Sequence, residues 1–150
     1  MAAVSLRAQA IRLLARREHA RSELQQKLIA KGADPDEVRL LLDELAAQDY
    51  LSDARYVRAT VAHKSGAFGR QRIIEELKSK GIARDDIETA LAEAQIDDEA
   101  ALNALWQRRF GRAPVDERDK ARQVRFLQAR GFAVSAILRL LRDRVSREPS

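Results

Sequence analysis

A helix-ending pattern occurs three times in this 150-residue chain. Each copy consists of a leucine, two further residues, a basic residue and a glycine, and the three glycines are Gly32, Gly81 and Gly131. Their spacing of about 50 residues lies in the range where internal repeats mark stacked supersecondary units. A basic last turn followed by glycine is typical of the end of an α-helix. The sequence therefore predicts one structural unit that is built three times.

The positions around each glycine agree as well. Gln123 departs from the register, because it stands where the other copies have Leu24 and Ile73. A single copy of the pattern would be weak evidence, because many helices end in this way. Three copies in register favour a true repeat. Apolar residues recur four residues before, six after and ten after the glycines, as Leu28, Leu77 and Leu127, then Val38, Ile87 and Ile137, then Leu42, Leu91 and Leu141.

Apolar residues at helical spacing predict three helices in each unit. We expect Ile73, Ile74 and Leu77 to form the buried face of the central copy. The expected helices cover about residues 5–17, 21–31, a segment beginning at Pro35, 53–65, 69–80, 85–94, a segment from Asp97 or Asp98 to Phe110, one started by Pro114 over 115–130, and 134–145.

The predicted fold class is all-α, with three tandem three-helix repeats that form an elongated, curved rod. The expected boundaries are 4–48, 52–95 and 97–146. Each unit carries too little core to be stable alone, so stacking has to supply the rest. Among the helix starts, Asp34 fits an N-cap before Pro35. The cap of the fourth helix is either Ser52 or Asp53, and that of the seventh is either Asp97 or Asp98.

Composition argues against most enzymes. The chain has no cysteine, which removes disulfides and thiolate metal sites. His19 and His63 have no paired motif, so we expect each to be a surface or loop histidine. The acidic clusters Asp85-Asp86 and Asp97-Asp98-Glu99 stand at helix starts, where they complement the helix dipole. We therefore expect no catalytic site, no metal and no cofactor.

No apolar run approaches the roughly 20 residues of a membrane span, and the N-terminus lacks a signal-peptide core. The sequence predicts a cytoplasmic monomer with no membrane association. The net charge is +5, and residues 101–150 hold 12 basic and 5 acidic side chains, a net of +7. Such a C-terminal basic excess indicates a polyanion or an acidic protein surface as the partner.

Exposed basic residues are therefore the candidate binding residues, although each one alone could equally be a solvated charge at a helix end. Trp106 and Phe110 are interpreted as core residues and not as a platform for base stacking. The candidates for contact with a partner or with DNA are Arg70, Arg72, Lys78, Lys80, Arg108, Arg109, Arg112, Lys120, Arg122, Arg125, Arg130, Arg139 and Arg142.

Three-helix units also suggest DNA-binding helix-turn-helix domains. The third helices of the first two units are acidic, which opposes entry into a groove lined by phosphates. Only the third unit is basic there, with Arg139, Arg142 and Arg144. We expect weak, non-specific contact with single- and double-stranded DNA and no sequence-specific reading.

In three blocks the chain resembles the RecX family of bacterial regulators of the RecA recombinase. The resemblance spans roughly residues 10–142. Where the family often has a serine cap, this chain has Ala20, so the cap is lost or has moved to Ser22. The blocks are Leu14–Leu24 through Lys31-Gly32, Tyr50–Arg58 with Gly69-Arg70 through Lys80-Gly81-Ile82, and Arg125–Phe132.

The resemblance implies a modular helical protein that binds the RecA–DNA filament along its helical groove. It also implies inhibition of recombinase, ATPase and coprotease activities, and hence modulation of DNA repair and the SOS response. The alternative hypothesis is a non-specific DNA-binding helical module that acts without a recombinase. Binding to the assembled filament, as opposed to DNA alone, distinguishes the two.

Overall fold

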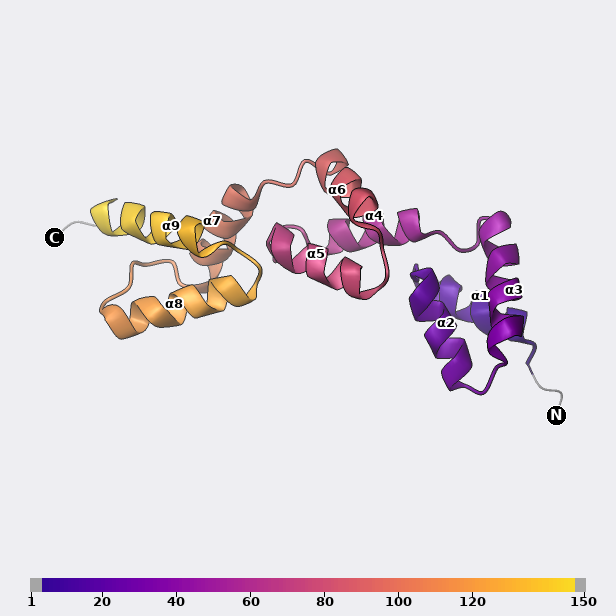
Figure 1. The fold of residues 1–150 in the computed structure, drawn as a ribbon. Helices are drawn as coiled ribbons and strands as arrows, with labels where there is room; N and C mark the ends of the chain where they lie inside the picture. The colour runs from indigo at the N-terminus through magenta and orange to yellow at the C-terminus, as the bar shows by residue number, and fades with distance from the viewer. Residues whose placement is uncertain (1–3, 148–150) are drawn as a thin grey trace. The chain divides into compact units, whose positions relative to one another are not determined.

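The computed structural model describes residues 4–147, and over this range the chain forms nine α-helices and no strand (Figure 1). The predicted all-α class is thus confirmed. Most of the expected helix ends agree to within about two residues. The helices are α1 (Leu6–Arg16), α2 (Arg21–Ala30), α3 (Pro35–Ala47), α4 (Asp53–Lys64), α5 (Arg70–Ser79), α6 (Arg84–Glu93), α7 (Asp98–Arg109), α8 (Glu117–Ala129) and α9 (Val134–Arg147).

The chain divides into two compact units. Unit 1 comprises residues 4–60 and 77–90 of the described chain, and unit 2 comprises residues 61–76 and 91–147. In unit 1, α2 packs against α1 and α3. In unit 2, α9 packs against α7 and α8.

The repeated glycines end their helices as predicted. Gly32, Gly81 and Gly131 have φ angles of +99°, +79° and +96°, which a residue without Cβ adopts readily. The residue after each glycine donates its N–H to the leucine carbonyl five residues before it, as Phe132 does to Leu127 at 3.4 Å. The same turn is therefore built three times.

The apolar positions of the register are buried. In unit 1 the core cluster includes Leu24, Leu28, Val38 and Leu42, and in unit 2 the corresponding cluster includes Leu127, Ile137 and Leu141. Ile73, Leu77, Ile87 and Leu91 of the central copy are fully buried as well. The expectation for Ile74 was wrong, since this side chain is only half-buried.

The exception to the register has a clear reason. Gln123 is 1% exposed, and its Oε1 accepts a hydrogen bond of 2.9 Å from Nε1–H of Trp106. Trp106 is itself buried, so its N–H needs an acceptor inside the core. A leucine at this position would leave that donor unsatisfied.

The sequence left two possible caps for α4 and two for α7, and in each pair the first residue is the cap. Ser52 accepts the N–H of Arg55 and so caps α4, and Asp97 accepts the N–H of Ala100 and so caps α7. Asp34 caps α3 as predicted. The carboxylates of Asp53 and Asp98, which follow Ser52 and Asp97, accept hydrogen bonds from other helices.

In unit 1, Oδ1 of Asp53 accepts the N–H of Arg21, the first residue of α2, at 2.8 Å. Nearby, the hydroxyl of Ser22 donates to the carbonyl of Lys80, so Ser22 does not serve as a cap. The N–H of Ala20 donates to Glu23 at 3.3 Å. The start of α2 therefore relies on acceptors from Glu23 and Asp53 in place of the missing serine.

In unit 2 the start of α5 is held in the same manner. Asp98 accepts the N–H of Arg70 at 3.0 and 3.2 Å through its two oxygens. The N–H of Gly69 donates to the carbonyl of Arg130 at 2.7 Å. A Cβ on Gly69 would lie 2.4 Å from the carbonyl oxygen of Gly131, so the close approach requires glycine.

One helix start differs from the prediction. Pro114 does not begin a helix, because α8 starts at Glu117. Asp116 is the N-cap and accepts the N–H of Asp119 at 2.7 Å. The side chain of Asp119 accepts the N–H of Val115 at 3.0 Å, which fixes the loop before the helix.

Candidate functional site

The candidate site is a set of cations that lie over aromatic rings in unit 2. We call it the cation–aromatic row. Four of its five cations are among the predicted binding residues. The row consists of the rings of Phe68, Phe110 and Phe126 with the cations of Lys64, Arg72, Arg109, Arg122 and Arg130.

Phe68 carries three of the cations. Nζ of Lys64 lies 4.7 Å from the ring centroid, Cζ of Arg130 5.1 Å and Cζ of Arg72 5.7 Å. The negative face of an aromatic ring attracts cations at such distances. Residue 68 lies in the loop between α4 and α5, and the positive φ of Gly66 (+88°) shapes the turn before it.

Phe126 and Phe110 continue the row. Their rings meet edge to face, with centroids 5.5 Å apart and an interplanar angle of 88°. Arg130 and Arg109 each lie 5.0 Å from the Phe126 centroid. Arg109 and Arg122 lie 5.4 and 5.3 Å from the Phe110 centroid. Arg109 and Arg130 therefore each contact two rings.

The local sequence explains this alignment. Arg122, Phe126 and Arg130 follow one another at four-residue spacing, so they share one face of α8 and its C-terminal cap. Arg109 and Phe110 end α7. The rings are half-buried and lie beneath the exposed side chains of Arg109 and Arg122 and the half-buried side chain of Arg130.

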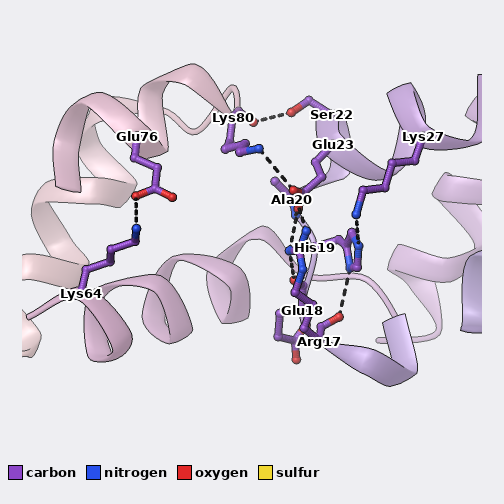
Figure 2. Close-up of polar contacts among 10 residues, drawn as sticks. All are labelled: Arg17, Glu18, His19, Ala20, Ser22, Glu23, Lys27, Lys64, Glu76 and Lys80. Atoms are coloured by element: carbon purple, nitrogen blue, oxygen red, sulfur yellow. Dashed lines mark hydrogen bonds and ion pairs between the residues drawn. The ribbon is translucent and has the colours of Figure 1, made fainter. Parts of the chain in front are cut away.

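Carboxylates neutralise only two of the five cations, as far as residues 4–147 are concerned. Arg122 donates to Asp119 at 2.8 Å, and this hydrogen bond lowers the pKa of the Asp119 carboxyl. Lys64 pairs with Glu76 at 3.2 Å (Figure 2). Among the described residues, Arg72, Arg109 and Arg130 have no such partner. The row is therefore positive overall and suits an anionic partner.

Further predicted residues surround a hollow beside the row. Arg112, Arg122 and Arg125 line it together with Arg118, which the sequence reasoning missed. Asp116 and Asp119 also line this hollow. The net character of this rim is still basic.

The remaining candidates of unit 2 lie elsewhere. Lys120 and Arg142 border a separate hollow that includes the exposed Val115 and Val145. Arg139 lies on α9 in a third hollow beside Asp143 and Arg144. Arg108 is exposed, and its Nη2 donates to the carbonyl of Gly66 at 3.4 Å.

The three candidates left are spread over α5 and its end. Arg70 is half-buried at the start of α5, beside the carboxylate of Asp98. Lys78 is exposed, and Lys80 donates to Glu23 at 3.3 Å in unit 1. Lys78 and Lys80 therefore belong to unit 1, whereas the row belongs to unit 2.

Sequence reasoning missed the aromatic members of the site. Trp106 is buried as expected, but Phe110 is only half-buried and contributes a ring to the row. Phe68 and Phe126 were not singled out as candidates. Each has an arginine two or four residues away, and that spacing is the one local signal that could have pointed to them.

His19 lies in the loop between α1 and α2, in line with one of the two expected positions, but its side chain is buried, with 1% exposed. Its Nδ1–H donates to the carbonyl of Arg17 at 3.0 Å, and Nε2 accepts from Lys27 at 2.9 Å. Burial lowers the pKa of His19 and keeps the ring neutral. Its role is to bridge two polar groups inside unit 1.

Glu23 lies beside this histidine in unit 1 (Figure 2). Its carboxylate receives two hydrogen bonds from Arg17, at 3.0 and 2.9 Å, and one from Lys80. Burial acts to raise the pKa of Glu23, but these bonds outweigh it and lower the pKa to about 2. The group is a structural ion cluster, since both cations are satisfied by it.

Within the described part of the chain, no group of three or more histidine or acidic residues could hold a metal ion. Between residues 4 and 147, no helix is both long and apolar enough to cross a bilayer.

The fold and the surface together define a protein of tandem three-helix domains, with a surface where basic side chains lie over aromatic rings. Family models for the first, second and third three-helix domains of RecX match residues 7–45, 52–91 and 97–141. The chain is 46% identical over 143 residues to the regulatory protein RecX of Pseudomonas putida (strain GB-1), covering 94% of this chain and 92% of that protein. The chain belongs to the RecX family of regulatory proteins.

Other relatives agree with this assignment. The regulatory protein RecX of Leptothrix cholodnii is 42% identical over 139 residues, which cover 93% of this chain and 88% of that protein. The crystal structure of RecX from Lactobacillus salivarius has a TM-score of 0.66 at 20% identity, covering 91% of this chain and 94% of that one. At that identity the likeness shows the fold alone.

Proposed function

We propose that this chain is a non-catalytic regulator that binds the RecA–DNA filament in its helical groove. Binding inhibits the recombinase, ATPase and coprotease activities and so modulates DNA repair and the SOS response. Membership of the RecX family supports a regulator of RecA. The single structural observation that carries the binding mode is the cation–aromatic row, because a filament on DNA presents phosphates and acidic side chains.

The proposed contacts follow from the geometry of unit 2. Arg109 and Arg130 are the strongest candidates, because each lies over two rings and neither has a carboxylate partner in residues 4–147. Arg112 and Arg125 extend the same basic face. Lys80 is the weakest candidate, since it already pairs with Glu23. We further propose that the protein acts as a cytoplasmic monomer.

Inhibition of RecA ATPase activity on single-stranded DNA tests this function. We expect the rate to fall as the protein approaches a stoichiometric ratio to the filament. Co-sedimentation with the assembled filament should rise in parallel. A rate that stays unchanged, together with protein left in the supernatant, would refute the proposal.

The second candidate is a DNA-binding module that acts without a recombinase, and the same row supports it. Phosphate contacts release counterions, so this function predicts tight binding to bare DNA with a steep salt dependence. Fluorescence anisotropy on bare oligonucleotides and on the assembled filament, at matched salt, separates the two. Equal affinity for both would favour the second candidate.

A further inference from the structure

Three cations converge on the ring of Phe68. They come from three segments of unit 2: Lys64 ends α4, Arg72 lies in the first turn of α5, and Arg130 follows the last residue of α8. All three charged groups lie within 5.7 Å of one centroid. Like charges gathered around one point repel one another unless an anion lies between them.

The neighbouring acceptors do not balance this charge. Lys64 has one carboxylate partner, Glu76, at 3.2 Å. Nη1 of Arg72 donates to the neutral carbonyl of Ala129 at 3.3 Å. Across the described chain, the guanidinium of Arg130 has no hydrogen-bonding partner and contacts only the rings of Phe68 and Phe126. A net positive charge of about two therefore remains around Phe68.

The chemistry of these donors selects the ligand. A guanidinium that lies over a ring keeps the N–H groups at its edge available, and these match the oxygens of phosphate. An ammonium from a third direction can reach a further oxygen. A tetrahedral phosphate offers oxygens in all of these directions, whereas a planar carboxylate has two oxygens in one plane.

We propose that Lys64, Arg72 and Arg130 form a binding site for a phosphate group among their charged groups, beside the ring of Phe68. The group belongs either to the backbone of a nucleic acid or to a free oligophosphate. This inference does not depend on binding to a recombinase.

An anion at this place would also stabilise unit 2. It would link the end of α4 to the contact between α5 and α8, where Gly69 donates to Arg130 at 2.7 Å. A ligand that binds the folded chain alone raises its stability by mass action. Occupancy of the site should therefore be visible as a higher melting temperature.

Isothermal titration calorimetry of the full chain with sodium tripolyphosphate tests the site. We expect one binding event, which Arg130→Gln and Arg72→Gln each weaken about tenfold through the loss of charged hydrogen bonds. Phe68→Leu should weaken it too, because the ring positions the cations. Arg139→Gln removes the same charge elsewhere in unit 2 and should change the affinity less than about twofold.

Two outcomes would overturn the site: no binding by the unaltered chain, or an equal loss in Arg139→Gln and Arg130→Gln. Melting curves of each variant without ligand show whether it is folded. If the Phe68 variant unfolds, the two arginine variants still decide the matter.

Competition identifies the source of the phosphate. A single-stranded thymidine oligonucleotide that displaces tripolyphosphate assigns the site to a nucleic-acid backbone. Binding of tripolyphosphate that the oligonucleotide does not displace assigns it to a free oligophosphate. Because RecA is absent from both experiments, failure of the filament proposal would leave these results unchanged.

Discussion

The carboxylate of Asp98 accepts the backbone N–H of Arg70 through both of its oxygens, at 3.0 and 3.2 Å. Asp53 likewise accepts the N–H of Arg21, through Oδ1 alone, at 2.8 Å. In each case the aspartate is the first residue of one helix and completes the start of another. The helix dipole favours a negative charge at this place. The repeat therefore includes this contact between two helix starts as well as the helices themselves.

Replacing Asp98 by alanine should destabilise unit 2. The N–H of Arg70 would lose its acceptor, and loss of a helix cap costs about 1 kcal/mol. Urea unfolding followed by circular dichroism measures the change. Glu99→Ala is the matched control, because it removes the same charge from the same turn of α7 at an exposed position with no cap on α5. Equal stability of the two variants would contradict the role of Asp98.

Gln123→Leu should be destabilising even though it restores the apolar register. The variant leaves the buried Nε1–H of Trp106 without an acceptor, at a cost of about 1–3 kcal/mol. Thermal unfolding followed by the fluorescence of the single tryptophan measures it. Gln107→Leu, at an exposed position of α7, serves as the control. A stabilised Gln123→Leu chain would show that the hydrogen bond is dispensable.

Gly131→Ala and Gly32→Ala should differ in cost. Both glycines have similar positive φ, so both variants carry about 1 kcal/mol of backbone strain. An added Cβ on Gly131 would lie 2.4 Å from Cβ of Arg72, whereas one on Gly32 meets nothing within 4 Å. We expect the additional overlap to cost roughly 1–3 kcal/mol in denaturant unfolding. Similar losses for both would mean that the Arg72 contact relaxes freely.

Stability should fall in acid through Glu23. Its folded pKa of about 2 lies below the usual 4.5, so its contribution is present above pH 4.5 and is lost as the pH falls towards 2. Because Arg17 is about half exposed and screened by solvent, we expect this contribution to be about 2 kcal/mol. Unfolding free energies of the unaltered chain and of Glu23→Gln, compared from pH 6 to pH 3, measure it. The difference between the two should shrink with falling pH, and a constant difference would exclude this origin.

Local patterns in the sequence predicted the helices because their causes are local. The leucines near Gly32, Gly81 and Gly131 share a helix face with their neighbours, and each glycine ends its own helix. The sequence could not decide whether Asp97 or Asp98 caps α7, because aspartate is a good cap at either position. The deciding interaction involves α5, since the N–H of Arg70 takes the carboxylate of Asp98 as its acceptor. The burial of His19 could not be predicted for a similar reason, since Lys27 and Arg17 satisfy its ring nitrogens only in the folded unit.

The candidate site could be predicted only in part. Charge alone pointed to Arg109, Arg122 and Arg130, which the structure does bring together. The sequence gives no sign that Phe68 meets Arg130, because the contact depends on how α5 and α8 pack. Composition could not separate Lys80 from the others either, as its partner Glu23 is far away in the sequence.

The dependence of α2 on Asp53 and Lys80 affects the order in which the chain becomes stable during synthesis. The ribosome makes the N-terminal residues first, and domains tend to fold as they emerge. The chain up to Ala47 can form its three helices, but the N–H of Arg21 and the hydroxyl of Ser22 wait for partners that are translated later. The segment of α1 to α3 therefore reaches its final stability only after Asp53 and Lys80 have been made.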